Sequence, residues 1–270
     1  MLTTLVSWNL KGSAGPSTDA VVAHLRAEGA DVVALQEVQW LQARRIARGL
    51  GARSRLWGFK HWPLRTWPEG MAIIGVTVPA RGRTRALSHR WRLWSWRRRI
   101  VQVAAISGAT SPSGDAGPDW TLVNVHLTPH GQIGLRAVEA AAVVELVAEG
   151  HGPIVVAGDF NERPDGAIHR QLEAAGLRDG WDVHPIGVAG DDRVGDDPAP
   201  AGRTEPWPTS WKGWRRGTTK APVRRLDYVY ASAGVRMVDV RVPRVGDDGF
   251  ARFAAISDHL PVTAVFEVEG

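Results

Sequence analysis

Short apolar segments recur along the whole of this sequence, and a polar residue stands at one end of each. LVSWN ends at Asn9, DVVALQE at Glu37 and LVNVH at His126, while IVVAGDFN carries Asp159 and Asn161 at its end. Apolar runs of about four to eight residues, bounded by Gly, Pro or polar turn formers, are typical of buried strands. The pattern therefore predicts many short strands whose tips carry polar side chains.

Two further strand-like segments have polar residues at their start. Asp227 opens DYVYAS, and Asp258 and His259 directly precede LPVTAVF. Any one of these residues alone is readily explained as an N-cap, a turn former or a satisfied buried polar group. Their repetition along the chain favours a shared site at one edge of the fold.

The chemistry of this set is restricted, because the chain contains no cysteine. That excludes disulfides, thiolate metal sites and cysteine nucleophiles. Carboxylate, amide and imidazole groups suit a hard divalent cation acting on phosphate. The set therefore predicts metal-assisted chemistry at phosphorus rather than redox or thiol chemistry.

Helical periodicity separates the strand-like segments in the first part of the chain. Residues 17–30 and 135–149 place apolar side chains on one helical face, and a residue of Ser17–Asp19 is expected to cap the first helix. A short helix is expected over 165–175, whose acidic start suits the helix dipole. Strands dominate the last part of the chain, so a mixed, layered fold of strands and helices is predicted.

Domain organisation follows from what interrupts this pattern. Residues 186–222 are rich in Gly, Pro and charge, which predicts a long surface loop. Neither a short repeat nor a linker divides the chain, so we expect a single domain over 1–270. The first ten residues lack a basic start and a long apolar core, and no segment has the roughly 18 apolar residues of a membrane span. A cytoplasmic location without stable membrane association is expected.

Positive charge is concentrated in two stretches, although the whole chain carries only +5. Residues 81–99 hold eight Arg and no acid, residues 203–225 hold five Arg and two Lys against one Glu, and six of the thirteen Trp lie in these stretches. Positive charge attracts polyanions, and aromatic faces stack on nucleobases. The alternative is that these are solvated loops whose Trp side chains pack on Arg stems and on the core.

The ordered segments SWN, LQEV, NVHL, GDFN, RLDYV and SDHLPV resemble the motifs of the endonuclease/exonuclease/phosphatase superfamily. That group includes deoxyribonuclease I, exonuclease III-type repair endonucleases, sphingomyelinases and inositol polyphosphate phosphatases. The resemblance runs from Asn9 to about Val265. It implies an α+β fold, a four-layer α/β/β/α sandwich of two mainly antiparallel β-sheets flanked by helices, with the catalytic residues at strand tips along one edge.

The resemblance also implies how a metal would be held. Glu37 matches the principal Mg²⁺ carboxylate, Asn9 its neighbouring amide ligand or orienting group, and Asp258 of the SDH segment a further metal residue. Mg²⁺ prefers oxygen ligands and keeps several waters, so one or two carboxylates suffice, and Mn²⁺ is an expected substitute. The ion would neutralise charge that grows on the phosphate in the transition state.

Catalytic roles follow from the same motifs. Asp159 would orient or deprotonate the attacking water, and Asn161 would donate to a phosphate oxygen. His259 would act as general base or charged stabiliser, oriented by Asp227 through a carboxylate–imidazole hydrogen bond. His126 matches a second imidazole in contact with the phosphate. The sequence leaves open whether His259 or Asp159 takes the proton of the water.

Further residues are assigned less directly. Glu69 is expected either to pair with His126 or to be a surface residue. An Arg before IVQVAAI would bind phosphate as a charged fork; Arg98 and Arg99 are the candidates, and Arg97 is not distinguished from them. Thr209 and Ser210 fall where relatives offer a hydroxyl to the phosphate.

Three functions fit these observations. A Mg²⁺-dependent nuclease acting on DNA or RNA is favoured by the two basic, Trp-containing stretches. The alternative is a phosphatase or phosphodiesterase of small phosphoesters or lipid headgroups, for which RLWGFKHWPLRTW is a candidate membrane-facing segment. A binding module with an inactive site is disfavoured, because every core motif residue is present. The only tyrosines, Tyr228 and Tyr230, lie inside a strand segment, which makes a specialised abasic-site enzyme less expected.

Overall fold

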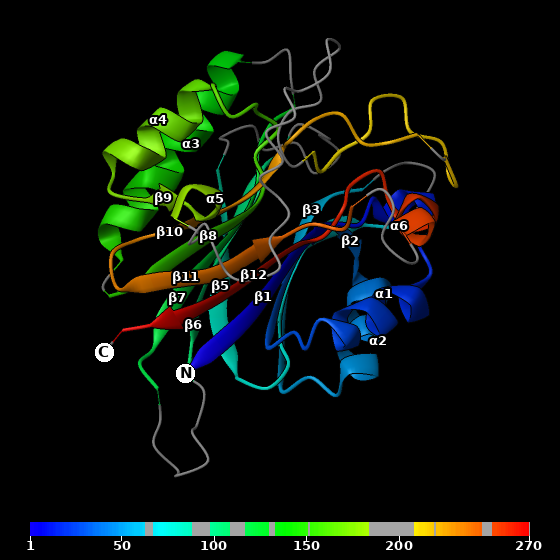
Figure 1. Ribbon diagram of the computed structural model, residues 1–270, viewed down its shortest axis with the longest axis horizontal. Helices are drawn as coiled ribbons and strands as arrows, with labels where there is room; N and C mark the ends of the chain where they lie inside the picture. Colours follow the sequence, from blue (N-terminus) through cyan, green and yellow to red (C-terminus); the bar gives the residue numbers. More distant parts are fainter. Residues whose placement is uncertain are drawn as a thin grey trace.

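Two β-sheets packed face to face form the centre of the computed structural model, and helices cover the outer face of each sheet (Figure 1). The structure describes residues 1–62, 67–87, 98–108, 117–129, 133–150, 152–183, 208–218, 220–244 and 250–269. The α+β, four-layer sandwich predicted from the family resemblance is confirmed.

The first sheet has the strand order β11-β12-β1-β2-β4-β3 and the second has the order β5-β6-β7-β8-β10-β9. Within each sheet one pair is parallel, β1 with β2 and β7 with β8, and the remaining pairs are antiparallel. The strands of the first sheet are β1 (Leu2–Asn9), β2 (Val32–Gln39), β3 (Ser54–His61), β4 (Glu69–Gly75), β11 (Val235–Arg241) and β12 (Val262–Val268). Those of the second are β5 (Ala80–Ala86), β6 (Ile100–Ile106), β7 (Trp120–His126), β8 (Ile154–Asp159), β9 (Arg178–Asp179) and β10 (Asp227–Ala231).

Helices α1, α2 and α6 pack on the outside of the first sheet, and α3 and α4 pack on the outside of the second (Figure 1). Their bounds are α1 (Thr18–Ala27), α2 (Trp40–Leu50), α3 (Ile133–Glu149), α4 (Ala167–Ala174), α5 (Gly180–Val183) and α6 (Phe250–Ile256), and a 3-10 helix η1 spans Gly12–Ala14. In the described part of the chain, no helix combines the length and the apolar character that crossing a membrane requires.

Local sequence explains most of these helices. Ser17 caps α1 by accepting a hydrogen bond from the Ala20 amide, as its position before an apolar-periodic segment predicts. Helix α2 was not predicted, because its capping box is made by Gln39 and Gln42 rather than by the usual Ser or Thr. Most of the expected 186–222 loop lies outside the described residues, and in the described part Ser210 forms bridges with Arg224 and His259.

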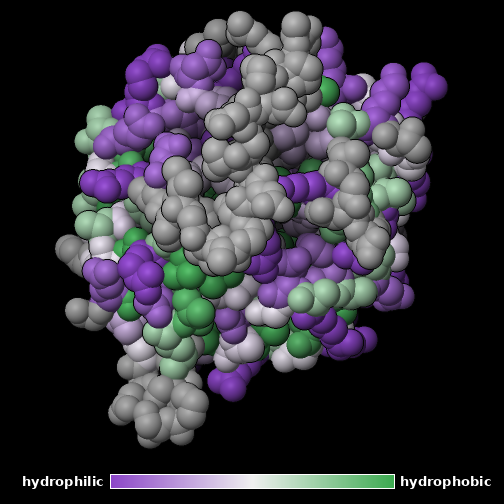
Figure 2. Space-filling view, in the orientation of Figure 1, coloured by the Kyte–Doolittle hydropathy of each residue, from purple (hydrophilic) through white to green (hydrophobic). Residues whose placement is uncertain are grey.

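Apolar side chains fill the space between the sheets and the two spaces between sheet and helices. On the face drawn in Figure 2, hydrophilic side chains cover most of the described surface. Burial of this apolar area is the main source of stability for such a layered fold.

A buried polar chain crosses the layer between the sheets. Gln36 of β2 donates from Nε2 to Asn124 Oδ1 on β7 at 2.8 Å, and Asn124 Nδ2 donates to Gln102 Oε1 on β6 at 3.0 Å. All three side chains are fully buried, where an unmade hydrogen bond is costly. These hydrogen bonds therefore fix how the two sheets are aligned with each other, and they place Glu37, next to Gln36, near the tip of β7.

Candidate active site

The strand tips of the two sheets meet at one edge of the sandwich. His126, Asp159 and Asp227 lie side by side across β7, β8 and β10 in the strand register. Asn9, at the end of β1 in the other sheet, donates from Nδ2 to Asp159 Oδ2 at 3.0 Å. This hydrogen bond joins residues 150 positions apart and closes the edge from both sheets.

Asp227, His259 and Asp159 form a buried line. His259 Nδ1 lies 2.7 Å from Asp227 Oδ2, and His259 Nε2 lies 3.8 Å from Asp159 Oδ2. Burial alone lowers the pKa of His259, but the two carboxylates overcome it and raise that pKa to about 10. Burial raises the pKa of Asp159 to about 7; the charge of His259 opposes this rise and that of Asp227 adds to it. The imidazole is thus held in its charged form between two acids.

Thr209 and Ser210 hold this line in place. The Thr209 hydroxyl donates to Asp227 Oδ2 at 2.6 Å and accepts from the amides of Leu226 and Asp227 at 3.1 and 3.2 Å. Thr209, for which a contact with the phosphate is predicted, is fully buried, and in this structure its hydroxyl is hydrogen-bonded within the protein. Ser210 Oγ lies 3.4 Å from His259 Nε2, the ring nitrogen that faces Asp159.

Lys60, which the sequence reasoning missed, lies on the other side of the site. Its Nζ is 3.3 Å from His126 Nδ1 and 3.7 Å from Glu37 Oε1. Burial and the charge of Arg99 lower the pKa of Lys60 to about 8. A signal was present: alternation in SRLWGFKH places Lys60 on the same face as Leu56 and Gly58, turned toward the interior.

His126 contacts both sides of the site. Its Nε2 lies 3.7 Å from Asp159 Oδ2 and 3.8 Å from Glu37 Oε1. Burial, with the charges of Lys60 and Arg99, lowers its pKa well below the ordinary value, so the ring is neutral. Because an ammonium group only donates, Nδ1 accepts from Lys60 and the ring proton stands on Nε2.

Backbone geometry at the site is unusual. Among the described residues other than glycine, positive φ occurs at Lys11 (46°), Glu37 (48°) and Asn161 (51°), and all three contact site residues. At Glu37 the pairing of β2 with β4 shifts register between Leu35 and Val38. Such bulges re-aim a side chain, and the Glu37 carboxylate remains reachable, with 26% of its side chain exposed.

Asn161 and Asp159 brace each other. The Asn161 amide N–H donates to Asp159 Oδ1 at 2.9 Å, and Asn161 Nδ2 donates to the Leu127 carbonyl at 3.0 Å. The side-chain NH₂ keeps a second proton, which leaves it able to donate to a substrate oxygen.

Asp258 and Asn9, two of the predicted metal residues, both contact Lys11. Asp258 Oδ2 forms an ion pair with Lys11 Nζ at 2.6 Å, and its charge adds to the rise in the pKa of His259. Asn9 Oδ1 accepts from the Lys11 amide at 3.1 Å while its Nδ2 serves Asp159. Both ends of the Asn9 amide are thus used by the protein, which fits the orienting role.

Glu69 is buried rather than on the surface, and its partner differs from the expected one. Oε2 lies 3.6 Å from His61 Nε2, and Oε1 accepts from the Ser13 amide. Among the described residues, His126 has Lys60, Glu37 and Asp159 as its partners instead. Burial, reinforced by the charge of Glu37, raises the pKa of Glu69 to about 7.

The two candidate arginines occupy different environments. Arg99 is buried, donates from Nε to Thr128 Oγ1 at 3.4 Å, and Thr128 is held by Glu139. Burial lowers the pKa of Arg99 against the attraction of Glu139, Glu37 and Asp159, so its charge acts on the site. Arg98 stacks over the Phe59 ring, 5.7 Å from its centroid. Arg97 lies outside the described residues.

The basic stretches are partly structural. Trp211 and Trp214 pack in the core between the first sheet and its helices, and Arg225 is buried in an ion pair with Asp179. Trp211 and Arg225 are therefore not available for stacking on bases, which supports the alternative interpretation for these two. Trp214 is half-buried, with Lys11 Nζ 4.8 Å from its ring centroid. The other four Trp of these stretches lie outside the described residues; they are Trp91, Trp94, Trp96 and Trp207.

Comparison with known proteins identifies the family. The model described as "Endonuclease/Exonuclease/phosphatase family" matches residues 6–259. The chain belongs to this family. No curated protein sequence matches it.

Solved structures share the fold of this endonuclease/exonuclease/phosphatase family member at low identity. A family protein from Bacteroides vulgatus has a TM-score of 0.72 at 16% identity, with both chains fully covered. One from Beutenbergia cavernae has a TM-score of 0.69 at 22% identity, covering 100% of this chain and 72% of its own. A mannosyl-6-phosphatase from Bacteroides thetaiotaomicron has a TM-score of 0.66 at 14% identity, covering 98% and 99%.

Members of this family are hydrolytic phosphoesterases that generally depend on a divalent metal, and the residues present fit such an ion. Ligand atoms of Asp159, Asp227 and His259 lie within 4.8 Å of one another, and His259 could bind an ion only in its neutral form. Asp227 Oδ1 is buried and has no hydrogen-bond partner within the described residues, and Glu37 offers a reachable carboxylate. An oxygen-rich set of this kind suits a hard divalent cation.

Proposed function

We propose that this protein is a divalent-metal-dependent phosphodiesterase that hydrolyses nucleic acid by attack of water on phosphorus. The observation that carries the proposal is the buried line Asp227–His259–Asp159, with 2.7 and 3.8 Å between neighbouring atoms. It provides a fixed positive charge beside a carboxylate that can accept a proton, at an edge that both sheets build.

The placement of His259 favours one division of roles. Its Nδ1 is engaged by Asp227, and carboxylates on both sides favour the imidazolium, which cannot accept a proton. We therefore assign His259 to stabilising negative charge on the phosphate and Asp159 to accepting the proton of the attacking water. Asn9 and Asn161 orient the Asp159 carboxylate through Oδ2 and Oδ1.

The opposite wall would bind the phosphate and the metal. Glu37 is assigned as the carboxylate that holds Mg²⁺ or Mn²⁺, and the bound ion would supply electrostatic stabilisation of a phosphate oxygen. Lys60 and Arg99 add buried positive charge, and His126 presents its Nε2 proton toward Glu37 and Asp159. Preorganised donors in a buried site are worth more than in water.

Nucleic acid is favoured by side chains at the rim. Trp62 follows His61 directly and Trp67 precedes Glu69 by two residues, and the two Trp are 56% and 64% exposed. Exposed aromatic faces beside a phosphate-binding site suit stacking on unpaired bases, and the chain carries a net charge of +5.

A small phosphoester is the second candidate substrate. The central groups are deeply buried, with Asp159 and Asp227 each 1% and His259 6% exposed. Such a recessed site suits a compact phosphate group, and one structural neighbour is a mannosyl-6-phosphatase.

A substrate panel tests the proposal: supercoiled plasmid, single-stranded DNA, RNA, phosphoinositides and sugar phosphates, each with Mg²⁺, with Mn²⁺ and with EDTA. Metal-dependent cleavage of a polynucleotide is expected, lost in His259→Ala and weakened in Glu37→Gln with a higher metal requirement. Release of inorganic phosphate from small esters with intact polynucleotides would establish the second candidate. Equal activity in EDTA would overturn the metal assignment.

A further inference from the structure

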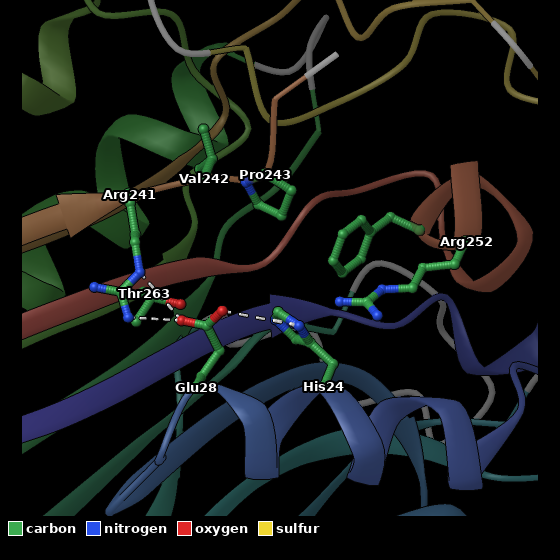
Figure 3. A pocket seen from close by; sticks show the side chains of 8 residues that line it. His24, Glu28, Arg241, Val242, Pro243, Arg252 and Thr263 are labelled. Carbon is green, nitrogen blue, oxygen red and sulfur yellow. Dashed lines mark hydrogen bonds and ion pairs between the residues drawn. The ribbon is translucent and has the colours of Figure 1, made fainter. Parts of the chain in front are cut away.

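A small pocket lies outside the catalytic edge, between α1, α6 and the end of β11 (Figure 3). Its volume is about 160 Å³, room for roughly five waters at about 30 Å³ each. Pockets for drug-sized ligands are about two to six times larger, about 300–1,000 Å³. The space therefore suits an ion or a very small molecule.

His24 of α1 borders this pocket with an unused polar ring. The side chain is 3% exposed, and neither Nδ1 nor Nε2 has a hydrogen-bond partner among the described residues. Glu28 Oε1 lies 4.0 Å from Nδ1, beyond hydrogen-bonding distance. Buried polar atoms are nearly always satisfied, so these two nitrogens point to a missing partner.

Aromatic contacts hold the His24 ring where it is. Trp8 meets it edge to face at 5.5 Å and 78°, and Phe253 at 4.9 Å and 87°. The orientation of the ring is thus fixed by packing rather than by a hydrogen bond.

Among the described residues around the pocket, Glu28 is paired with one of the two arginines. Glu28 accepts hydrogen bonds from Arg241 at 3.2 and 2.8 Å, and Arg241 also pairs with Asp239. Arg252 of α6 contacts the Phe253 ring at 5.0 Å and has no carboxylate partner within the described residues. Figure 3 shows its guanidinium reaching toward His24.

We propose that this pocket binds a small phosphate oxyanion between the guanidinium of Arg252 and a ring N–H of His24. A guanidinium presents paired N–H groups that match two oxygens of one phosphate. His24 supplies a second donor at the inner end, so the ion would satisfy the buried ring while its charge offsets that of Arg252.

Binding at this pocket is linked to protonation. Within the described part of the chain, the charged groups that face His24 are Glu28 of α1, Arg241 of β11 and Arg252 of α6. Without a ligand, burial lowers the pKa of His24 to about 4. An anion beside the ring raises that pKa, so binding takes up a proton and tightens as the pH falls.

The pocket is separate from the catalytic residues but lies close to them. Trp8 packs on His24 and donates from Nε1 to the His259 carbonyl at 2.9 Å, and Asn9 follows Trp8 in β1. Because the catalytic edge itself binds phosphate in the proposed function, the test must report on His24 alone.

Proton NMR of the His24 Cε1–H group provides that readout. The signal is assigned by its loss in His24→Phe, and inorganic phosphate is titrated in EDTA at constant ionic strength, at mildly acidic and mildly alkaline pH. We expect a saturable shift of the His24 signal, a higher His24 pKa in phosphate, and tighter binding at the acidic pH.

Matched arginine variants decide whether the pocket is responsible. Arg252→Gln removes the proposed ligand and is expected to weaken the His24 response by about tenfold or more. Arg236→Gln removes an exposed arginine that pairs with Glu267 outside the pocket and should leave the response unchanged. A His24 signal that phosphate does not move, or equal responses in the two variants, would overturn the proposal. Arg252 is exposed, so the Gln variant is expected to fold.

Discussion

His259 Nδ1 lies 2.7 Å from Oδ2 of Asp227, and the same oxygen accepts a hydrogen bond from the Thr209 hydroxyl at 2.6 Å. The imidazole is therefore oriented by a carboxylate that is itself held from the other side. This pair joins the start of β10 to the segment before β12, and it determines which face of His259 meets Asp159.

Asp227→Asn tests that orientation. The amide no longer favours the imidazolium, so we expect kcat to fall by roughly 10²- to 10⁴-fold while the fold is retained. Steady-state kinetics at saturating metal measure the effect, with Asp165→Asn, an exposed Asp beyond the site, as control. A kcat within twofold of the wild-type value in Asp227→Asn would contradict the assigned role of His259.

Lys60→Met tests the buried ammonium that sequence reasoning missed. Losing a preorganised charge beside His126 and Glu37 should lower kcat by roughly 10²-fold. Because burying an ammonium is costly, the free energy of unfolding should stay the same or rise by about 1 kcal/mol. Kinetics and urea denaturation separate the two effects; Arg53→Met, at an exposed turn, is the matched control. A purely structural lysine would instead give lower stability with normal kcat.

Asn124→Ala tests the polar chain between the sheets. Its side chain bonds Gln36, Gln102 and the carbonyls of Leu35 and Ala72, and the substitution removes all of these buried hydrogen bonds. We expect a loss of about 2–4 kcal/mol in the free energy of unfolding. Thr121→Ala, on the same strand and half-buried, should cost far less; equal losses in urea denaturation would show that the chain is not a specific stabiliser.

His169 predicts how stability depends on pH. Burial lowers its pKa from 6.5 to about 4, and Nδ1 is bonded to Tyr230 Oη at 2.7 Å. The unfolded chain therefore binds more protons between pH 6.5 and 4, and the free energy of unfolding falls as the pH is lowered through this window, by up to about 3 kcal/mol from this group.

Urea denaturation across that pH range measures the slope, and His169→Gln should flatten it. An unchanged slope in the variant would assign the acid sensitivity to other buried histidines, such as His24 and His61, whose pKa values burial also lowers to about 4.

Strands β1, β2, β7, β8, β10 and β12 and helices α1, α3 and α4 were predictable from the sequence, because apolar periodicity and capping residues are local signals. Strands β3 and β5 were not predicted. The polar residues at the strand tips could also be identified from the sequence. Asn9, Glu37, Asp159 and His259 stand at the ends of apolar segments that are recognisable from their local pattern. Helix α2 was missed because glutamines cap it, and α6 because seven residues give too short a period to detect.

Partner choice at the site was decided only by the tertiary structure. Three of these partner contacts join residues 18 to 247 positions apart: Lys60 with His126, Asp258 with Lys11, and Thr209 with Asp227. In the fourth contact, Glu69 lies against His61, its neighbour across β3 and β4. The sequence shows which polar groups stand at each strand end. Which of the buried charged groups pair with one another depends on the order of the strands and on the alignment of the two sheets. Both are determined by burial and hydrogen bonding over the whole chain.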